Sequence, residues 1–181
     1  MKAAAASAVG LLAAPVTVLT VCHDGRVHGT TVSALTTVSR TPLLLTASLR
    51  EGSDLAQLAL AEGRFAVNVL SGGQRAVARR FADRDRPAGA AQFEGFAWRT
   101  DRYSGAPLLD GALAHYACRV RGSFLVGDHE VLLGLVVRAD AGLSGLPLLS
   151  YDGELLAGGA DADLSCVPDF PIIHPKETAT L

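Results

Sequence analysis

Three runs of aliphatic and β-branched residues follow one another in the first third of the chain, with no helical pattern between them. They span residues 16–21, 27–32 and 43–49. Asp24 and Gly25 separate the first two runs, and an Asp-Gly pair between apolar runs is the strongest local signal for a β-hairpin. Strands that succeed one another without a helix pair antiparallel rather than in a Rossmann layout. These runs therefore predict a mainly antiparallel sheet.

The second half of the chain carries the same kind of signal. Residues 65–70 are apolar and predict another strand. Residues 116, 118 and 120 are apolar whereas 115, 119 and 121 are polar, which is typical of an antiparallel strand with one wet face. Gly127 and Asp128 then precede the apolar run 131–137, and glycine at the first turn position favours a two-residue type II′ hairpin.

Helical patterns are few. Residues 3–12 predict a short leading helix that ends before Pro15. Residues 54–62 predict a second helix, with Ser53 as its N-cap and Gly63 as its C-terminal stop. Residues 74–81 predict a third, and residues 82–112 are loop-rich and can fold over a ligand.

About six strands and two or three helices predict a mainly antiparallel β fold, and a closed barrel would remove its exposed edges. A chain of 181 residues fits one compact domain. We expect residues 1–152 to form this domain. Residues 153–181 carry Pro168, Pro171 and Pro175, and we expect them to form an extended arm, in the same domain or partly disordered.

Charge and cysteine usage exclude several functions. A formal net charge of −2 argues against nucleic acid as a partner. The five arginines between residues 75 and 86 are interleaved with Asp83 and Asp85, which indicates a solvated helix face or a contact with a small phosphate group. Three widely spaced cysteines predict neither disulfides nor a zinc site and are compatible with a reducing cytoplasm. We expect neither a signal peptide nor a membrane span.

Three segments are candidates for chemistry, although GxGxxG, Walker, HExxH and GxSxG motifs are missing. Residues 28–39 gather small hydroxyl side chains around Gly29, which can bind a flat polar ring or form only a capped edge strand. Residues 48–53 precede a predicted helix and can hold an anion, or only cap that helix. His129 follows the turn at 127–128 and suits proton exchange, or is merely an exposed hairpin histidine.

Seven segments, in order, resemble the flavin reductase-like family of FMN-binding split barrels. They are APVTVLT (14–20), HGTTVSA (28–34), PLLL (42–45), FAVNVL (65–70), ARRFA (78–82), PLLDGA (107–112) and GDH (127–129). No single segment is specific, but their ordered combination is. The chain is most similar to the reductase components of two-component flavin-dependent monooxygenases. The resemblance implies a homodimeric split β-barrel with FMN or FAD at the subunit interface.

The resemblance also implies which residues contact the flavin ring. Thr31, Val32 and Ser33 would face the isoalloxazine edge, with Thr37 nearby. Members of the family often end with a Tyr- or His-containing strand that frames the site, and here Tyr151 matches that strand.

The remaining implied contacts surround the phosphate and cover the ring. Ser48, Leu49 and Ser53 would lie along the ribityl phosphate. Arg80 and Phe81 would close over the flavin. No metal is implied.

His129 matches the family position on the nicotinamide side of the site. The main hypothesis is therefore an NAD(P)H:flavin oxidoreductase that passes a hydride from NADH or NADPH to FMN or FAD and supplies a separate monooxygenase with reduced flavin. A second is a split-barrel tailoring enzyme that acts on a small metabolite, with flavin tightly bound or lost. A third is a non-catalytic flavin-binding module.

Overall fold

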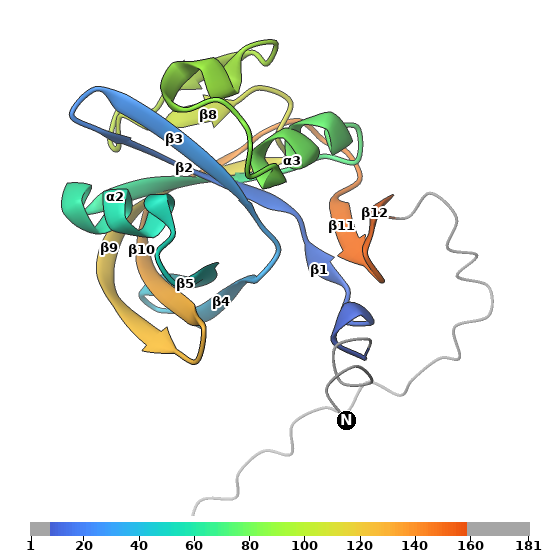
Figure 1. Cartoon of the computed structure of the whole chain (residues 1–181), viewed down its shortest axis with the longest axis horizontal. Helices are drawn as coiled ribbons and strands as arrows, with labels where there is room; N and C mark the ends of the chain where they lie inside the picture. Colours follow the sequence, from blue (N-terminus) through green and yellow to red (C-terminus); the bar gives the residue numbers. More distant parts are fainter. Residues whose placement is uncertain (1–7, 159–181) are drawn as a thin grey trace, which may run out of the picture.

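Residues 8–158 are described by the computed structural model, and a curled antiparallel sheet dominates them (Figure 1). This sheet has seven strands in the order β3-β2-β6-β9-β10-β5-β4. All neighbouring pairs are antiparallel. The strands are β2 (Thr17–His23), β3 (Arg26–Val32), β4 (Leu35–Arg40), β5 (Leu43–Arg50), β6 (Arg64–Val69), β9 (Ala114–Val126) and β10 (His129–Ala141). The predicted antiparallel β class is confirmed.

The chain connection between the two outermost strands explains the curl. β3 and β4 stand at opposite ends of the sheet, yet only Ser33 and Ala34 separate them in sequence. Strands spaced at about 4.8 Å would place the outer strands of a flat sheet roughly 29 Å apart. Three residue steps reach only about 10 Å. The sheet must therefore bend round, and the amide of Ser48 on β5 donates to the carbonyl of Ala34 at 2.9 Å.

The inside of the curl holds the main hydrophobic core. The side chains of Leu19, Phe65 and Leu132 are buried there. Helix α2 (Asp54–Glu62) covers one opening and adds Leu55, whose side chain is fully buried. The apolar, β-branched residues predicted as strands are those that fill this space.

A second core lies on the other face of β2 and β3. Helix α3 (Arg75–Ala82) and the 3₁₀ helix η1 (Gly89–Phe93) bring Phe81 and Phe93 together, with ring centroids 4.9 Å apart. Gly29 on β3 leaves room for these rings, because a Cβ there would lie 2.9 Å from Phe81. This packing makes β2 a strand buried on both faces, as its unbroken apolar run predicts.

Buried amide side chains attach the irregular segment 83–112 to the sheet. Gln92 accepts from the Gly29 amide at 2.8 Å and donates to the carbonyl of Val27 at 3.2 Å. Asn68 donates to the carbonyl of Val18 at 3.0 Å and accepts from the Leu109 amide at 2.8 Å. Because buried polar groups require partners, these bonds fix the segment in one position.

Two smaller sheets complete the described fold. β1 (Ala14–Pro15), β11 (Leu148–Tyr151) and β12 (Glu154–Ala157) pair in the order β1-β11-β12. β7 (Trp98–Thr100) pairs with β8 (Pro107–Leu109). In Figure 1 the β1-β11-β12 sheet stands to one side of the curled sheet.

Several local predictions are confirmed. Asp24 and Gly25, at φ 49° and 74°, form the tight turn between β2 and β3. Gly127, at φ 62°, and Asp128 form the two-residue turn between β9 and β10. Gly63, at φ 75°, ends α2 in the left-handed region that glycine favours.

Other predictions need correction. Residues 35–40 form β4, an edge strand that pairs with β5, whereas the sequence indicates a single ligand-binding stretch or edge strand over residues 28–39. Residues 82–112 contain η1, β7 and β8. Residues 154–157, at the start of the predicted extended arm, form β12 against β11, and Leu155 packs on the second core.

Two predicted segments, the leading helix and the C-terminal arm, lie partly outside the described residues. Of the predicted leading helix, residues 8–10 are helical and residues 1–7 lie outside the described part. Residues 159–181 of the predicted arm lie outside it as well. Ser53 occupies the N-cap of α2 but makes no capping hydrogen bond through its side chain within the described chain.

Gly134 on β10 provides a test of the main core. A Cβ at this position would lie 2.6 Å from Phe65 Cζ and 3.3 Å from Cys118 Cβ, and both side chains are buried. Gly134→Ala should lower the free energy of unfolding by about 1–3 kcal/mol through overpacking, as measured by urea denaturation. Gly73→Ala is the matched control, because no atom lies within 4 Å of its Cβ position. Equal effects of the two substitutions would contradict this packing.

Candidate functional site

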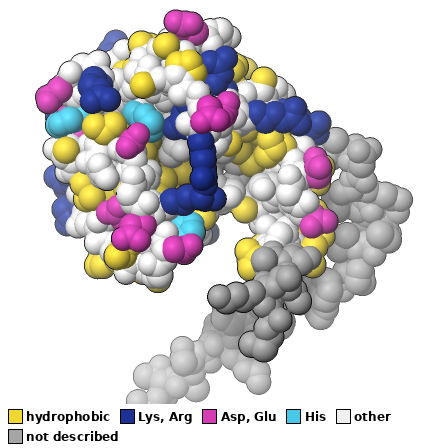
Figure 2. Space-filling view, in the orientation of Figure 1, with side chains coloured by type: hydrophobic (Ala, Val, Ile, Leu, Met, Phe, Trp, Pro, Cys, Tyr) yellow, Lys and Arg dark blue, Asp and Glu magenta, His cyan; other side chains and the backbone are white. Residues whose placement is uncertain are grey.

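An open cleft with a volume of about 580 Å³ lies where the ends of the curled sheet approach α2. Its walls are the end of β3 and the link to β4, the end of β5 with the loop to α2, the segment after α3, and the start of β10. The lining residues are Thr30, Thr31, Val32, Ser33, Ala34, Ser48, Leu49, Arg50, Glu51, Gly52, Ser53, Asp54, Ala82, Arg84, Arg86 and His129. Figure 2 shows Lys or Arg side chains across a hollowed part of this face, with acidic and His side chains beside them.

The β3 wall of the cleft is hydroxyl-rich. The Thr31 hydroxyl donates to the carbonyl of Ala78 on α3 at 2.8 Å, so its oxygen keeps lone pairs for a ligand donor. Val32 is only 4% exposed and belongs to the main core, so it offers mainly backbone to the cleft. Ser33 is exposed at the link to β4. This wall therefore combines main-chain groups with small hydroxyls.

The β5 wall continues into an anion-binding arrangement. Leu49 is 5% exposed and faces the core, whereas Ser48 alternates to the other face. The next residues reach Ser53 at the N-cap of α2, where the first helical amides point out of the helix without intrahelical partners. Helix N-termini and their amides favour negative charge. A phosphate can bind at this end of the cleft.

Backbone hydrogen bonds hold that loop against the β9–β10 hairpin. The Glu51 amide donates to the carbonyl of Asp128 at 3.1 Å, and the Ser53 amide donates to the carbonyl of Arg50 at 3.1 Å. His129, the first residue of β10, pairs with Arg50 across the sheet. These bonds fix His129 beside the anion-binding end.

His129 is oriented by its neighbour. Its Nδ1 lies 2.8 Å from Oδ1 of Asp128. The hydrogen bond from His129, together with its charge, holds the pKa of the Asp128 carboxyl below its ordinary value. A carboxylate bonded to one ring nitrogen sets the tautomer of the imidazole and leaves the other nitrogen for a substrate.

Arg84 and Arg86 bring positive charge to the segment that follows α3. Arg86 donates through Nη2 to the carbonyl of Gly29 at 2.7 Å and through Nη1 to the carbonyl of Asp83 at 2.6 Å. Its buried Nε has no hydrogen-bond partner within residues 8–158. The fixed guanidinium places a positive charge at the cleft, which favours an anionic group there.

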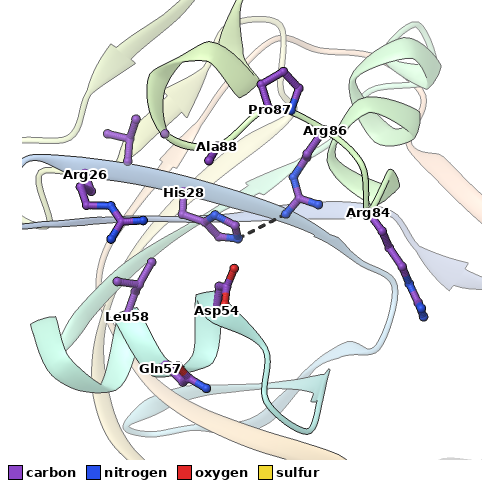
Figure 3. A pocket seen from close by; sticks show the side chains of 11 residues that line it. Arg26, His28, Asp54, Gln57, Leu58, Arg84, Arg86, Pro87 and Ala88 are labelled. Carbon is purple, nitrogen blue, oxygen red and sulfur yellow. Dashed lines mark hydrogen bonds between the residues drawn. The ribbon is translucent and has the colours of Figure 1, made fainter.

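His28 on β3 also contacts Arg86, with Nη2 of Arg86 3.2 Å from Nε2 of His28 (Figure 3). Arginine can only donate, so Nε2 accepts and the imidazole is neutral. Burial first, and then the charges of Arg86 and Arg26, lower the pKa of His28 below its ordinary value against the opposing effect of Asp54.

Seven of the predicted site residues come together at this cleft. They are Thr31, Val32, Ser33, Ser48, Leu49, Ser53 and His129. The structure thus brings the three candidate segments into one place, although each came from a separate part of the sequence.

Four predicted residues lie elsewhere in this chain. Phe81 is fully buried and its ring contacts those of Phe93 and Phe96, and its contact with a flavin stays a prediction. Arg80 lies over the ring of Phe96, with its guanidinium carbon 5.7 Å from the ring centroid. Thr37 on β4 and Tyr151 on β11 do not line the cleft either.

Sequence reasoning left three charged lining residues out of the candidate segments: Asp54, Arg84 and Arg86. Arg84 and Arg86 stood within the basic cluster that indicated either a solvated helix or a phosphate contact. They lie beyond the end of α3, and the anchoring of their segment by Gln92 has no local sequence signal.

None of the helices in the described residues is long and apolar enough to cross a membrane. The described residues form a small antiparallel β protein whose cleft is lined by hydroxyls, helix N-terminal amides and arginines, groups that are suited to bind a phosphate. Residues 9–159 match the model of the flavin reductase like domain. The chain belongs to this family, and the predicted resemblance is confirmed.

Individual relatives agree with this assignment. The chain is 40% identical over 134 residues to the NADPH-flavin oxidoreductase of Streptomyces viridifaciens, covering 74% of this chain and 69% of that protein. It is 36% identical over 148 residues to the NADH-dependent FAD reductase of Streptomyces globisporus, covering 82% and 81%.

Solved structures show the same fold. The NADH:FAD oxidoreductase of Streptomyces globisporus C-1027, in complex with NAD and FAD fragments, superposes with a TM-score of 0.81 at 32% identity, covering 90% of this chain and 95% of that one. The flavin reductase component of a bacterial two-component tryptophan halogenase superposes with a TM-score of 0.81 at 29% identity, covering 87% and 98%.

The neutral state of His28 predicts a pH dependence of stability. A lowered folded-state pKa gives stability that is present above the unfolded pKa of about 6.5 and is lost as the pH falls through the folded value. The free energy of unfolding should therefore decrease between pH 7 and pH 5. In His28→Gln, whose amide still accepts from Arg86, this decrease should be smaller. Urea denaturation at pH 7 and at pH 5 measures the decrease in the free energy of unfolding. An identical decrease in His28→Gln would contradict a neutral His28 in the folded chain.

Proposed function

We propose that the chain is an NAD(P)H:flavin oxidoreductase, which transfers a hydride from NADH or NADPH to FMN or FAD and supplies reduced flavin to a partner monooxygenase. The observation that carries this proposal is the convergence of the β3 hydroxyl wall, the anion-binding end at Ser53 and His129 on one cleft. Relatives over most of the chain bear the names of NADPH-flavin and NADH-dependent FAD reductases.

The donor set of the cleft fits a flavin nucleotide. The amides at the start of α2 and the guanidiniums of Arg50 and Arg84 can bind the ribityl phosphate, at the end of the cleft where positive charge collects. Ser48 and Ser53 can bond the phosphate or the ribityl hydroxyls. Thr31 and the main chain near Ser33 offer groups for the polar edge of the isoalloxazine.

Bound flavin supplies the redox chemistry, by accepting a hydride at N5. The protein orients the two reactants, and orientation alone can contribute a large part of a rate enhancement. His129 lies at the end of the cleft beside the hairpin turn, held by Asp128. Its free ring nitrogen can hydrogen-bond the nicotinamide carboxamide and hold that ring against the flavin.

Nucleotide binding at this site needs no Rossmann fingerprint. In a Rossmann fold a glycine-rich turn leads into the helix that binds the pyrophosphate. Here the loop 50–53 leads from β5 into α2, so helix N-terminal amides serve the same purpose in an antiparallel framework.

We further propose that two copies form a homodimeric split barrel with the flavin between them. Phe124, Leu125 and Val126 are about 60% exposed in the hairpin that leads to His129, and such apolar side chains favour a protein contact. A second copy packed there would help to enclose the open cleft. Relatives named as reductase components of two-component monooxygenases support a separate oxygenase partner.

The cytoplasm is the proposed location. Cys22 and Cys118 are free thiols, which is compatible with a reducing compartment.

Purified protein should oxidise NADH or NADPH when FMN or FAD is added, in a spectrophotometric assay. His129→Ala should lower this turnover by about tenfold or more, because the nicotinamide loses its positioning group, while the flavin Kd changes by less than about twofold. His23→Ala is the matched control, since His23 bonds Glu62 away from the cleft and should leave turnover unchanged.

Three outcomes would contradict the proposal or part of it. Flavin binding without nucleotide oxidation would indicate a flavin-binding module. Tightly bound flavin that is reduced only in the presence of a metabolite would indicate a tailoring enzyme. An unchanged rate in His129→Ala would remove His129 from the site.

A further inference from the structure

A second cavity of about 300 Å³ adjoins the flavin cleft. Asp54, Arg84 and Arg86 line both spaces, so the cavity continues from the anion-binding end of the cleft. We call it the side pocket. Its other walls are Arg26 and His28 on β3, Gln57 and Leu58 on α2, and the segment that ends at Gly89 (Figure 3).

The charges of the side pocket favour an anion. Arg26, Arg84 and Arg86 contribute three positive charges, whereas Asp54 contributes one negative charge. His28 is neutral and accepts from Arg86, which holds that guanidinium between the two spaces. These charges favour an anionic group of a ligand at the end of the side pocket that adjoins the flavin cleft.

The remaining walls suit a nucleoside. Leu58 and Pro87 offer apolar surface for a base, and Gln57 offers both a donor and an acceptor. Asp54 can accept from ribose hydroxyls. A volume of about 300 Å³ lies at the lower end of the range for small-molecule sites.

We propose that the side pocket binds the adenosine monophosphate half of FAD and makes FAD the preferred flavin. This inference rests on the proposed function. FMN ends at a single phosphate, which the loop 50–53 and the start of α2 can bind without the side pocket. FAD carries a second phosphate, a ribose and an adenine beyond that point, and the cationic, nucleoside-sized space begins there.

NADH carries the same adenosine monophosphate group, and NADPH carries it with an added 2′-phosphate, so either nucleotide could also place this group in the side pocket. Continuity with the flavin cleft favours FAD. Arg84 and Arg86 stand between the two spaces, where the pyrophosphate of a single ligand spanning both would lie.

Two variants change the side pocket without touching the flavin cleft. Arg26→Glu reverses a charge on β3, and Gln57→Trp fills the space from the exposed face of α2. Arg75→Glu is the matched control, an exposed charge reversal on α3 that lines neither space. The Kd values for FAD and for FMN are measured with each protein by the quenching of flavin fluorescence.

The wild-type chain and Arg75→Glu should bind FAD about tenfold more tightly than FMN. Both side-pocket variants should raise the Kd for FAD by about tenfold and change the Kd for FMN by less than about twofold. Equal effects on both flavins, or none, would overturn the assignment. An unchanged FAD Kd with a raised KM for NADH or NADPH, with FMN as acceptor, would also overturn it and give the side pocket to the nicotinamide nucleotide.

These outcomes separate the two proposals. If the wild-type chain binds flavin with the expected selectivity but oxidises no NAD(P)H, the reductase function fails and the side pocket stands. If it reduces FMN but the variants leave FAD binding unchanged, the side pocket fails and the reductase function stands.

Discussion

The short connection between the outermost strands of the main sheet is the constraint on which the rest of the structure depends. Ser33 and Ala34 alone join β3 to β4, which stand at opposite ends of seven strands. A sheet with this connection has to curl, and its inner face then becomes an enclosed core around Phe65 and Leu132. The same curl brings the end of β3 against β5, through the bond from the Ser48 amide to Ala34.

The candidate site is a consequence of this closure. The cleft is lined by residues from four stretches, 30–34, 48–54, 82–86 and 129, which are well separated in the sequence. Two hydrogen bonds to main-chain carbonyls hold these segments together: the Glu51 amide donates to Asp128 in the hairpin turn, and the Arg86 guanidinium donates to Gly29 on β3. These bonds attach the walls of the cleft to the main sheet.

The elements with local signals could be predicted from the sequence. The turns at Gly25, Gly63 and Gly127 need a positive φ that glycine supplies, and the core strands carry apolar runs. β12 could not be predicted, because its residues become a strand only when β11 offers an edge. Local sequence does not record such tertiary pairing.

The candidate site likewise has residues that local sequence signals reveal and residues that only the tertiary structure places. The hydroxyl segment, the loop before α2 and His129 carry chemistry that their residue types reveal, and the structure brings them together. Phe81 could not be placed in this way, since an aromatic residue on a helix suits a core or a ligand equally, and only the structure shows its ring against those of Phe93 and Phe96. The central claim is that the cleft between β3, α2 and His129 holds the flavin. A crystal structure of the chain with FMN tests it most directly: we expect the phosphate at the loop 50–53 and the ring between residues 31–33 and His129, whereas flavin bound at any other surface would contradict the account.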